Sequence, residues 1–209
     1  MNTFHQIRIL TVDDHPLFRE GIASLVGTQP DMAIIGEASS GLEAIDRFRE
    51  LRPDVTLMDL RMANLDGIEA ITRIIGEFPE AKIIVLTTYS GDAQIVRALK
   101  AGAHGYLLKG LLRTELLDTI RAVHQGRKRV SPEVASQVAE YAIDGALTSR
   151  EVDVLRLIAQ GNANKIVADR LSVTEDTVKA HVRSILSKLG ANDRTHAVTI
   201  ALRRGIIDL

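Results

Sequence analysis

The first 125 residues alternate short hydrophobic runs with stretches in which apolar residues recur at the period of a helix. The runs that predict strands are Ile7–Val12, Ala33–Ala38, Val55–Met58, Ile83–Thr87 and Gly105–Leu108. The helical patterns between and after them are Pro16–Val26, Leu42–Leu51, Ile68–Phe78, Asp92–Ala101 and Arg113–Gln125. The third and fourth runs are apolar on both faces, as central parallel strands are. We therefore predict a doubly wound α/β domain with a five-stranded parallel sheet.

The pattern changes after Gln125. Residues 126–146 carry a basic tripeptide, a Ser-Pro pair and an amphipathic stretch, and we interpret them as a linker with one helix. From Leu147 onward only helical patterns occur, beginning with the capping box Thr148-Ser-Arg-Glu151. A short turn at Ser172-Val173 separates two of these helices, which predicts a helix-turn-helix. The predicted organisation is an α/β domain over 1–125, a linker over 126–146 and a small all-α domain over 147–209.

Composition narrows the class of protein. The 209 residues include no Cys, so disulfides and thiolate metal sites are excluded. No apolar stretch approaches the ~20 residues of a membrane span, and the N-terminus lacks a signal-peptide core, so we expect a cytoplasmic protein without a membrane partner. Residues 1–125 carry 13 Lys and Arg against 17 Asp and Glu, a net charge of −4, whereas residues 126–209 carry 13 against 10, a net charge of +3. A mildly basic C-terminal part hints at nucleic acid.

Polar residues stand where the predicted strands end, at Asp13, Asp14, Asp59, Thr87 and Lys109. The carboxyl ends of parallel strands lie on one edge of a sheet, so these residues should converge in one crevice. Asp13 and Asp14 can offer oxygen ligands to Mg²⁺, and Asp59 can be both a third ligand and a nucleophile toward a phosphoryl group. Lys109 can pair with a phosphoryl oxygen, and the Thr87 hydroxyl can donate to another.

Each of these residues alone has an ordinary structural explanation. A pair of Asp after a strand is most often a helix cap or part of a loop, and a single Asp or Lys there is usually solvated. Thr87 alone is a β-branched strand residue, and Tyr106 alone is a strand aromatic. Their conjunction at the same end of the strands is what favours a site.

The region 7–125 resembles the receiver domains of two-component response regulators, through the motifs TVDDHP, LMDLRM, VLTTYS and GYLLKG. The resemblance implies a flavodoxin-like fold in which Asp59 is the phosphoacceptor. It also implies that Asp13, Asp14 and Asp59 hold Mg²⁺ together with the backbone carbonyl oxygen of Arg61.

The same resemblance implies a switch pair, in which the Thr87 hydroxyl moves toward the phosphoryl group as the Tyr106 ring turns inward. Two positions depart from the family. Ala63 replaces a usual Pro, and Gly110 follows Lys109 where many receivers have Pro. The second departure leaves open whether the peptide after Lys109 is cis, because a cis bond without Pro costs ~2.5–4 kcal/mol.

The stretch TEDTVKAHVRSILSKLG predicts a helix with two different faces. Its apolar stripe is formed by Val178, Val182, Ile185, Leu186 and Leu189. Its other face carries Thr177, Ala180, Arg183, Ser184 and Ser187, flanked by Lys179 and Lys188. Small and basic residues on one face suit a helix that enters the major groove of DNA. The alternative is a surface helix with scattered charges.

Residues 147–209 are similar to the LuxR-type DNA-binding domain of NarL/FixJ-like regulators, through the opening LTSRE and the core TVKAH. The resemblance implies that Lys179, Ala180 and Arg183 lie nearest the bases, with Thr177 and Lys188 near phosphates. The last helix, AVTIALRRG, would supply a dimer face.

These features predict a phosphorylation-controlled transcription regulator. A sensor histidine kinase would phosphorylate Asp59, and the released C-terminal domain would bind promoter DNA as a homodimer. Chemistry at Asp59 would be phosphotransfer with slow self-dephosphorylation, so we expect a switch and not an enzyme. One alternative is a regulator that works without phosphorylation, for which Asp59→Asn would leave DNA binding unchanged. The other is a Mg²⁺-dependent phosphohydrolase, which would turn over a generic phosphomonoester.

Overall fold

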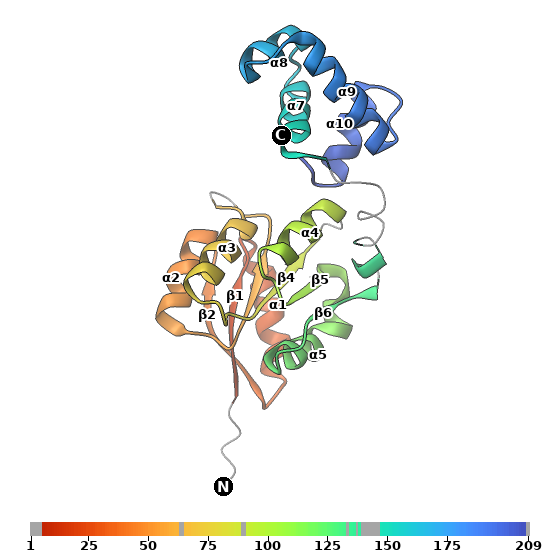
Figure 1. Ribbon diagram of the computed structural model, residues 1–209. Coiled ribbons are helices and arrows are strands. Elements are labelled where there is room, and N and C mark those ends of the chain that lie inside the picture. The colour runs from red at the N-terminus through yellow and green to blue at the C-terminus, as the bar shows by residue number, and fades with distance from the viewer. Residues whose placement is uncertain are drawn as a thin grey trace. The chain divides into compact units, whose positions relative to one another are not determined.

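The structure is a computed structural model that describes residues 6–62, 65–88, 91–132, 134–136, 138 and 147–207. The chain falls into two compact units, of which the first comprises Met1–Ser90 and Ile95–Val134 and the second comprises Gly91–Gln94 and Ala135–Leu209. Figure 1 labels helices and strands of both units.

The first unit is built on a parallel sheet whose strands occur in the order β2-β1-β3-β4-β5-β6. The first five are β1 (Ile7–Val12), β2 (Met32–Ala38), β3 (Val55–Asp59), β4 (Ile83–Thr87) and β5 (Gly105–Leu108). The helices between and after them are α1 (Pro16–Gly27), α2 (Gly41–Leu51), α3 (Gly67–Glu77), α4 (Asp92–Lys100) and α5 (Leu112–His124). These elements confirm the predicted doubly wound α/β fold.

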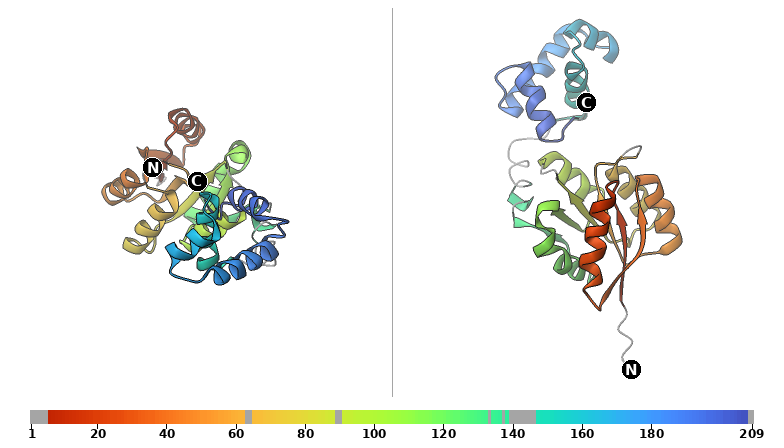
Figure 2. Two further views of the ribbon diagram at one scale, coloured as in Figure 1. Left: turned by 90° about the horizontal axis from the view of Figure 1, so that it is seen from above. Right: turned by 180° about the vertical axis from the view of Figure 1, so that it is seen from behind.

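Helices cover both faces of this sheet. Figure 1 shows α2, α3 and α4 in front of the strands, and the reverse view in Figure 2 shows α1 and α5 on the opposite face. Under α1 and α5, apolar side chains of β1, β3 and β4 meet Ile22 and Val26 of α1 and Leu116 and Ile120 of α5. Every residue of β3 and β4 is buried, as expected of central strands in a three-layer domain.

A short sixth strand, β6 (Arg129–Val130), adds to the five predicted. It lies within the region interpreted as linker and pairs in parallel with β5, with Gly105 opposite Arg129. A Cβ atom at Gly105 would lie 3.3 Å from the Arg129 carbonyl oxygen, so glycine allows this close approach. Two residues with one apolar side chain carry no strand periodicity, so only the tertiary pairing reveals β6.

The second unit is all α-helical in its described part, as predicted. Its helices are α7 (Ser149–Ala159), α8 (Asn164–Leu171), α9 (Glu175–Leu189) and α10 (Arg194–Arg203). The predicted capping box is present, with the Thr148 hydroxyl accepting from the Glu151 N–H. Ser172 adopts the left-handed conformation at the end of α8, and Thr174 caps α9, which completes the helix-turn-helix. These helices enclose a core that includes Val154, Leu155, Val167, Val178, Ile185 and Ala201.

Residues 132, 134–136 and 138 of the predicted linker helix are helical, and the rest of that helix lies outside the described residues. Ala63 is also outside them. No helix in the described part of the chain is long and apolar enough to cross a membrane.

Candidate functional site

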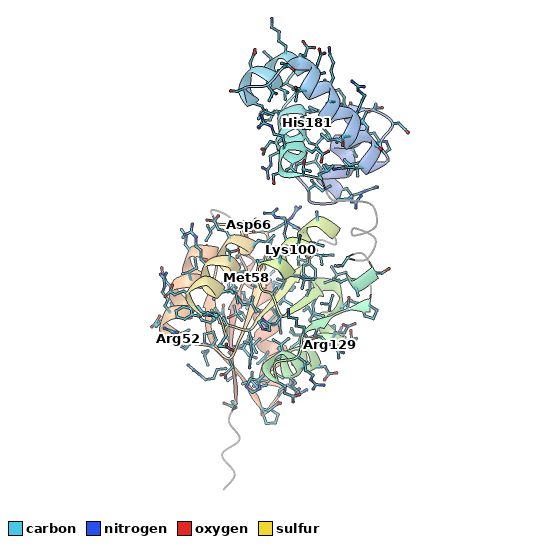
Figure 3. All side chains as sticks on the ribbon, viewed as in Figure 1. Arg52, Met58, Asp66, Lys100, Arg129 and His181 are labelled. Atoms are coloured by element: carbon cyan, nitrogen blue, oxygen red, sulfur yellow. The ribbon has the colours of Figure 1, made fainter. Side chains whose placement is uncertain are left out.

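The sheet brings the predicted polar residues to one edge. Asp13 directly follows β1, and Asp59 is the last residue of β3, which pairs with β1. Thr87 ends β4, the next strand along, and Lys109 opens the short 3₁₀ helix η1 (Lys109–Leu111) after β5. In Figure 3, Met58, the residue before Asp59, marks the central strand. Adjacent strands therefore carry these side chains to the same edge of the sheet, where Asp59 and Lys109 line a cleft.

The Lys109 ammonium bridges two carboxylates from different strands. Its Nζ lies 2.5 Å from Asp13 Oδ2 and 2.8 Å from Asp59 Oδ2. All three side chains are at least nine-tenths buried. Burial disfavours the charged ammonium, but the hydrogen bonds to Asp13 and Asp59 outweigh it and raise the pKa of Lys109. Lys109 therefore stays protonated and offsets part of the negative charge of two buried carboxyl groups.

Asp59 is the carboxylate most affected by its surroundings. Burial raises its pKa, and the hydrogen bond and charge of Lys109 oppose that rise. The Arg61 backbone N–H donates to Asp59 Oδ1 over 3.3 Å. Desolvation makes an ionised carboxylate more reactive than in water, and the charge of Lys109 favours the ionised form. These are the properties required of a carboxylate nucleophile.

The two residues of the expected switch pair lie in the interior of the first unit. Thr87 and Tyr106 are each completely buried. Burial and the nearby charge of Asp59 raise the pKa of the Tyr106 phenol far above its usual range, so it stays neutral. Its sensitivity to Asp59 places the Tyr106 hydroxyl within the electrostatic reach of the acidic site.

The acidic side chains form a group able to hold a cation. Ligand atoms of Asp13, Asp14, Asp59 and His15 all lie within 4.8 Å of one another. His15 Nδ1 is 2.7 Å from Asp14 Oδ1 and 3.1 Å from Asp13 Oδ1. Three carboxylates provide the hard oxygen donors that Mg²⁺ prefers, so the donor set fits that ion. The Asp14 side chain is one-third exposed, which leaves the group open to solvent.

Three residues at the start of α1 belong to the site although the sequence did not single them out. His15 and Phe18 line a cleft of about 480 Å³ together with Asp59 and Lys109. The Lys109 Nζ lies 4.2 Å from the centre of the Phe18 ring, and Arg19 donates to the Asp13 carbonyl oxygen over 2.6 Å. Their position just after the Asp pair was the available signal, but their roles depend on how α1 packs.

Backbone geometry fixes the two loops that border Asp59. A Cβ atom at Gly67 would lie only 2.2 Å from the Asp59 carbonyl oxygen, so α3 can begin there only with glycine. The Gly67 N–H donates to the Leu60 carbonyl oxygen over 3.1 Å. No cis peptide occurs among the described residues, so the bond between Lys109 and Gly110 is trans.

In the second unit, α9 presents the predicted DNA-contacting residues on its surface. Lys179, Ala180 and Arg183 are exposed, and Thr177 is half-buried near the start of the helix. Lys179 lies 3.1 Å from Asp176 and 3.7 Å from Glu175, both on the preceding turn. The spacing of 179, 180 and 183 puts these side chains on one face of α9, opposite the buried Val178 and Ile185. His181, labelled in Figure 3, is half-buried at the border of that face.

Lys188 has an intramolecular partner that the sequence did not reveal. Its Nζ lies 2.8 Å from Glu151, a residue of α7 that is 4% exposed. The Ser184 hydroxyl donates to the other Glu151 oxygen over 2.7 Å. Burial of Glu151 raises its pKa, but the hydrogen bonds from Lys188, Ser184 and Thr148 outweigh burial and lower the pKa to about 2. A buried carboxylate thus ties α9 to α7.

Comparison with known proteins identifies the class. The chain matches the family described as response regulator receiver domain over residues 9–121, and the luxR family of bacterial regulatory proteins over residues 145–201. It belongs to the response regulators that join a receiver domain to a LuxR-type DNA-binding domain, as the motifs implied. Members of this class are transcriptional regulators.

Particular relatives resemble it over nearly their whole length. The chain is 42% identical to the transcriptional regulatory protein LiaR of Bacillus subtilis, covering 97% of this chain and 100% of LiaR. It is 41% identical to the response regulator VraR of Staphylococcus aureus, covering 96% of this chain and 99% of VraR. Among solved structures, the chain resembles RcsB of Salmonella enterica serovar Typhimurium bound to promoter P1flhDC in the presence of the phosphomimetic BeF₃⁻. The two are 27% identical with a TM-score of 0.75, covering 93% of this chain and 97% of RcsB.

Proposed function

We propose that Asp59 accepts a phosphoryl group from a sensor histidine kinase and that the modified protein binds promoter DNA as a homodimer. The observation that carries the proposal is the Lys109 bridge between Asp13 and Asp59 in an open cleft. One carboxylate there, Asp59, lines the cleft beside the Lys109 ammonium and a group of oxygen ligands. This arrangement suits in-line attack on phosphorus.

In the proposed transfer, a carboxylate oxygen of Asp59 forms the new O–P bond while the N–P bond to the histidine of the kinase breaks. Two anions approach each other in this step, so their repulsion must be offset. Lys109 is placed to pair with a phosphoryl oxygen once Asp59 is modified. Asp13, Asp14, Asp59 and the Arg61 carbonyl oxygen would hold Mg²⁺, which neutralises charge on the phosphoryl group when bound.

We propose that Thr87 and Tyr106 report the modification. A hydroxyl at the end of β4 can donate to a phosphoryl oxygen on Asp59 at the end of the neighbouring β3. Movement of Thr87 would change the space available to the Tyr106 ring. Both side chains are completely buried, so a shift of one must be accommodated by its neighbours.

For DNA recognition, we propose that α9 enters the major groove with Lys179, Ala180 and Arg183 nearest the base edges. Thr177 and the exposed side of Lys188 would lie near phosphates. An ammonium has three donors, so Lys188 can keep its bond to Glu151 and still face a phosphate. We assign a receiver domain to 1–125, a linker to 126–146 whose first residues add β6 to the receiver sheet, and the DNA-binding domain to 147–209, in a cytoplasmic protein with access to promoters.

The acceptor is tested by incubation with Mg²⁺ and a small acyl phosphate. One alkali-labile phosphoryl group should be added to the wild-type protein and none to Asp59→Asn, with Asp54→Asn as the matched control because Asp54 bonds only the backbone of Arg8 in the described structure. Label on Asp59→Asn at the wild-type level would overturn the assignment. Unchanged DNA binding by Asp59→Asn would favour the phosphorylation-independent regulator, and turnover of a phosphomonoester would favour a phosphohydrolase.

The DNA interface is tested with footprinted promoter DNA. Lys179→Ala and Arg183→Ala should each weaken specific binding by roughly 1–3 kcal/mol and relax base preference at one position. Arg156→Ala removes an exposed cation from α7 that pairs with Asp153, and it is the control for general charge loss. A folded Lys179/Arg183 double alanine variant with unchanged affinity and sequence preference would refute the proposed groove contacts.

A further inference from the structure

We propose that the receiver unit carries a second DNA-contacting surface, which binds the phosphate backbone flanking the site held by α9. This surface, called here the basic edge, consists of Arg127, Lys128 and Arg129, with Lys82 nearby. The three consecutive side chains are all exposed. Arg129, labelled in Figure 3, lies on β6 at the edge of the sheet. The proposal rests on DNA binding by the C-terminal domain and extends it to the other unit.

The cations of the basic edge lack the partners that most other cations of this unit have. The ion pairs elsewhere include Arg19–Glu37, Arg47–Glu50, Arg49–Glu77, Arg73–Glu69, Arg97–Asp66 and Arg121–Asp31. Arg127, Lys128, Arg129 and Lys82 form no ion pair with any carboxylate in the described part of the chain. The sequence contains no Asp or Glu from Thr119 to Pro132. Positive charge is therefore concentrated at one edge of a domain that is acidic as a whole.

The pKa of His104 responds to the positive charge of this region. His104 ends the turn before β5, and burial is the main reason that its pKa is lowered. The positive charges of Lys128 and Lys82 lower that pKa further, which places both near the ring. Glu80 is the carboxylate that acts in the opposite sense. Lys82 also donates to the carbonyl oxygen of His124 at the end of α5, so its ammonium is partly engaged in capping that helix.

A run of basic residues in a linker is commonly just a solvated tail, but the backbone here is fixed. The Arg129 N–H donates to the His104 carbonyl oxygen over 2.9 Å, and the Arg127 N–H donates to that of Ala122 over 3.0 Å. After β6 the chain is anchored by Ser131 and Val134, both buried. The three side chains thus project from a rigid support, so little backbone entropy is lost when they bind.

DNA phosphates fit this surface better than a protein partner does. The chain belongs to a DNA-binding class, so a polyanion is already one of its ligands. Residues 131–146 separate the basic edge from the C-terminal domain, a tether of at most about 60 Å even when fully extended. DNA bound by that domain is therefore held at high local concentration, and individually weak phosphate contacts suffice. A dry protein interface requires apolar side chains at its centre, and there is none among the three consecutive cations.

The test compares the full-length triple variant Arg127→Gln, Lys128→Gln, Arg129→Gln with the wild type on two promoter duplexes. One duplex ends at the half-sites, and the other extends two helical turns beyond them. On the long duplex, the slope of log K against log[salt] should become shallower by about two to three units, with roughly 10- to 100-fold weaker binding at 0.15 M salt. On the short duplex, the two proteins should bind equally.

The matched control is Arg47→Gln, Arg49→Gln, Arg73→Gln, which removes the same charge from α2 and α3 and should leave both slopes unchanged. The proposal would be overturned if the triple variant bound both duplexes equally more weakly than the wild type. It would also be overturned if the control variant weakened binding to the long duplex as much as the triple variant does. A third outcome would also overturn the proposal. If the triple variant kept the wild-type salt slopes but dimerised less well on addition of beryllofluoride without DNA, as measured by sedimentation, the basic edge would bind a second copy of the chain and not DNA. Circular dichroism checks that the variants are folded.

Discussion

The buried Glu151 of the DNA-binding domain offers a quantitative test of how α9 is held. Glu151 receives hydrogen bonds from the Thr148 N–H over 2.7 Å, from Ser184 over 2.7 Å and from Lys188 over 2.8 Å. Its pKa falls from 4.5 to about 2. At ~1.4 kcal/mol per pKa unit, this shift corresponds to about 3 kcal/mol in favour of the ionised form in the folded state.

Glu151→Gln keeps the shape of the capping box but removes the charge that Lys188 neutralises. The Lys188 side chain is 31% exposed, so water compensates part of the loss and we expect about 2 kcal/mol of destabilisation. For a domain of this size the unfolding transition should fall by roughly 10 °C. Differential scanning calorimetry of the full chain measures this shift, and hydrogen exchange of the α7 and α9 amides assigns it to the C-terminal unit.

The pH dependence gives the same prediction an independent check. Because the folded pKa of Glu151 lies below the unfolded value, its stabilisation is fully present above pH 4.5 and is lost as the pH falls toward 2. The stability difference between wild type and Glu151→Gln at pH 3 should be less than half of that at pH 7. Glu175→Gln removes an exposed carboxylate 3.7 Å from Lys179 and is the control, with a change below ~0.5 kcal/mol. A Glu151→Gln protein as stable as the control at pH 7 would refute the reasoning.

Three further outcomes follow from the receiver. Gly67→Ala should destabilise the unit by about 1–3 kcal/mol in urea, since its Cβ would meet the Asp59 backbone at 2.2 Å, whereas Gly76→Ala, with nothing within 4 Å, should be neutral or stabilising. Lys109→Met should raise the pKa of Asp59 further and abolish modification; an unchanged carboxyl titration by carbon NMR would contradict this. Chelation of Mg²⁺ should block modification without lowering the melting temperature, because the Lys109 ammonium bonds both Asp13 and Asp59 without the ion; a parallel loss of both would contradict it.

The sequence by itself determined the fold class of the first unit and the residues that meet at its polar edge. Short hydrophobic runs with two apolar faces, alternating with helical patterns, indicated central parallel strands, and the polar residues that end them were therefore expected to share one edge. Asp13, Asp59 and Lys109 therefore meet as expected although 96 positions separate the first from the last. The caps Thr148 and Thr174 likewise marked helix starts correctly, because capping is a local interaction.

Only the tertiary structure decided which side chains meet across elements. Phe18 under the Lys109 ammonium depends on how α1 packs on the sheet, and the Glu151–Lys188 pair depends on the approach of α7 to α9. Strand β6 depends on Gly105 leaving room for a neighbouring backbone. None of these contacts has a periodic signature, because each joins residues whose separation along the chain is set by the packing of whole elements and not by the local geometry of a helix or a strand.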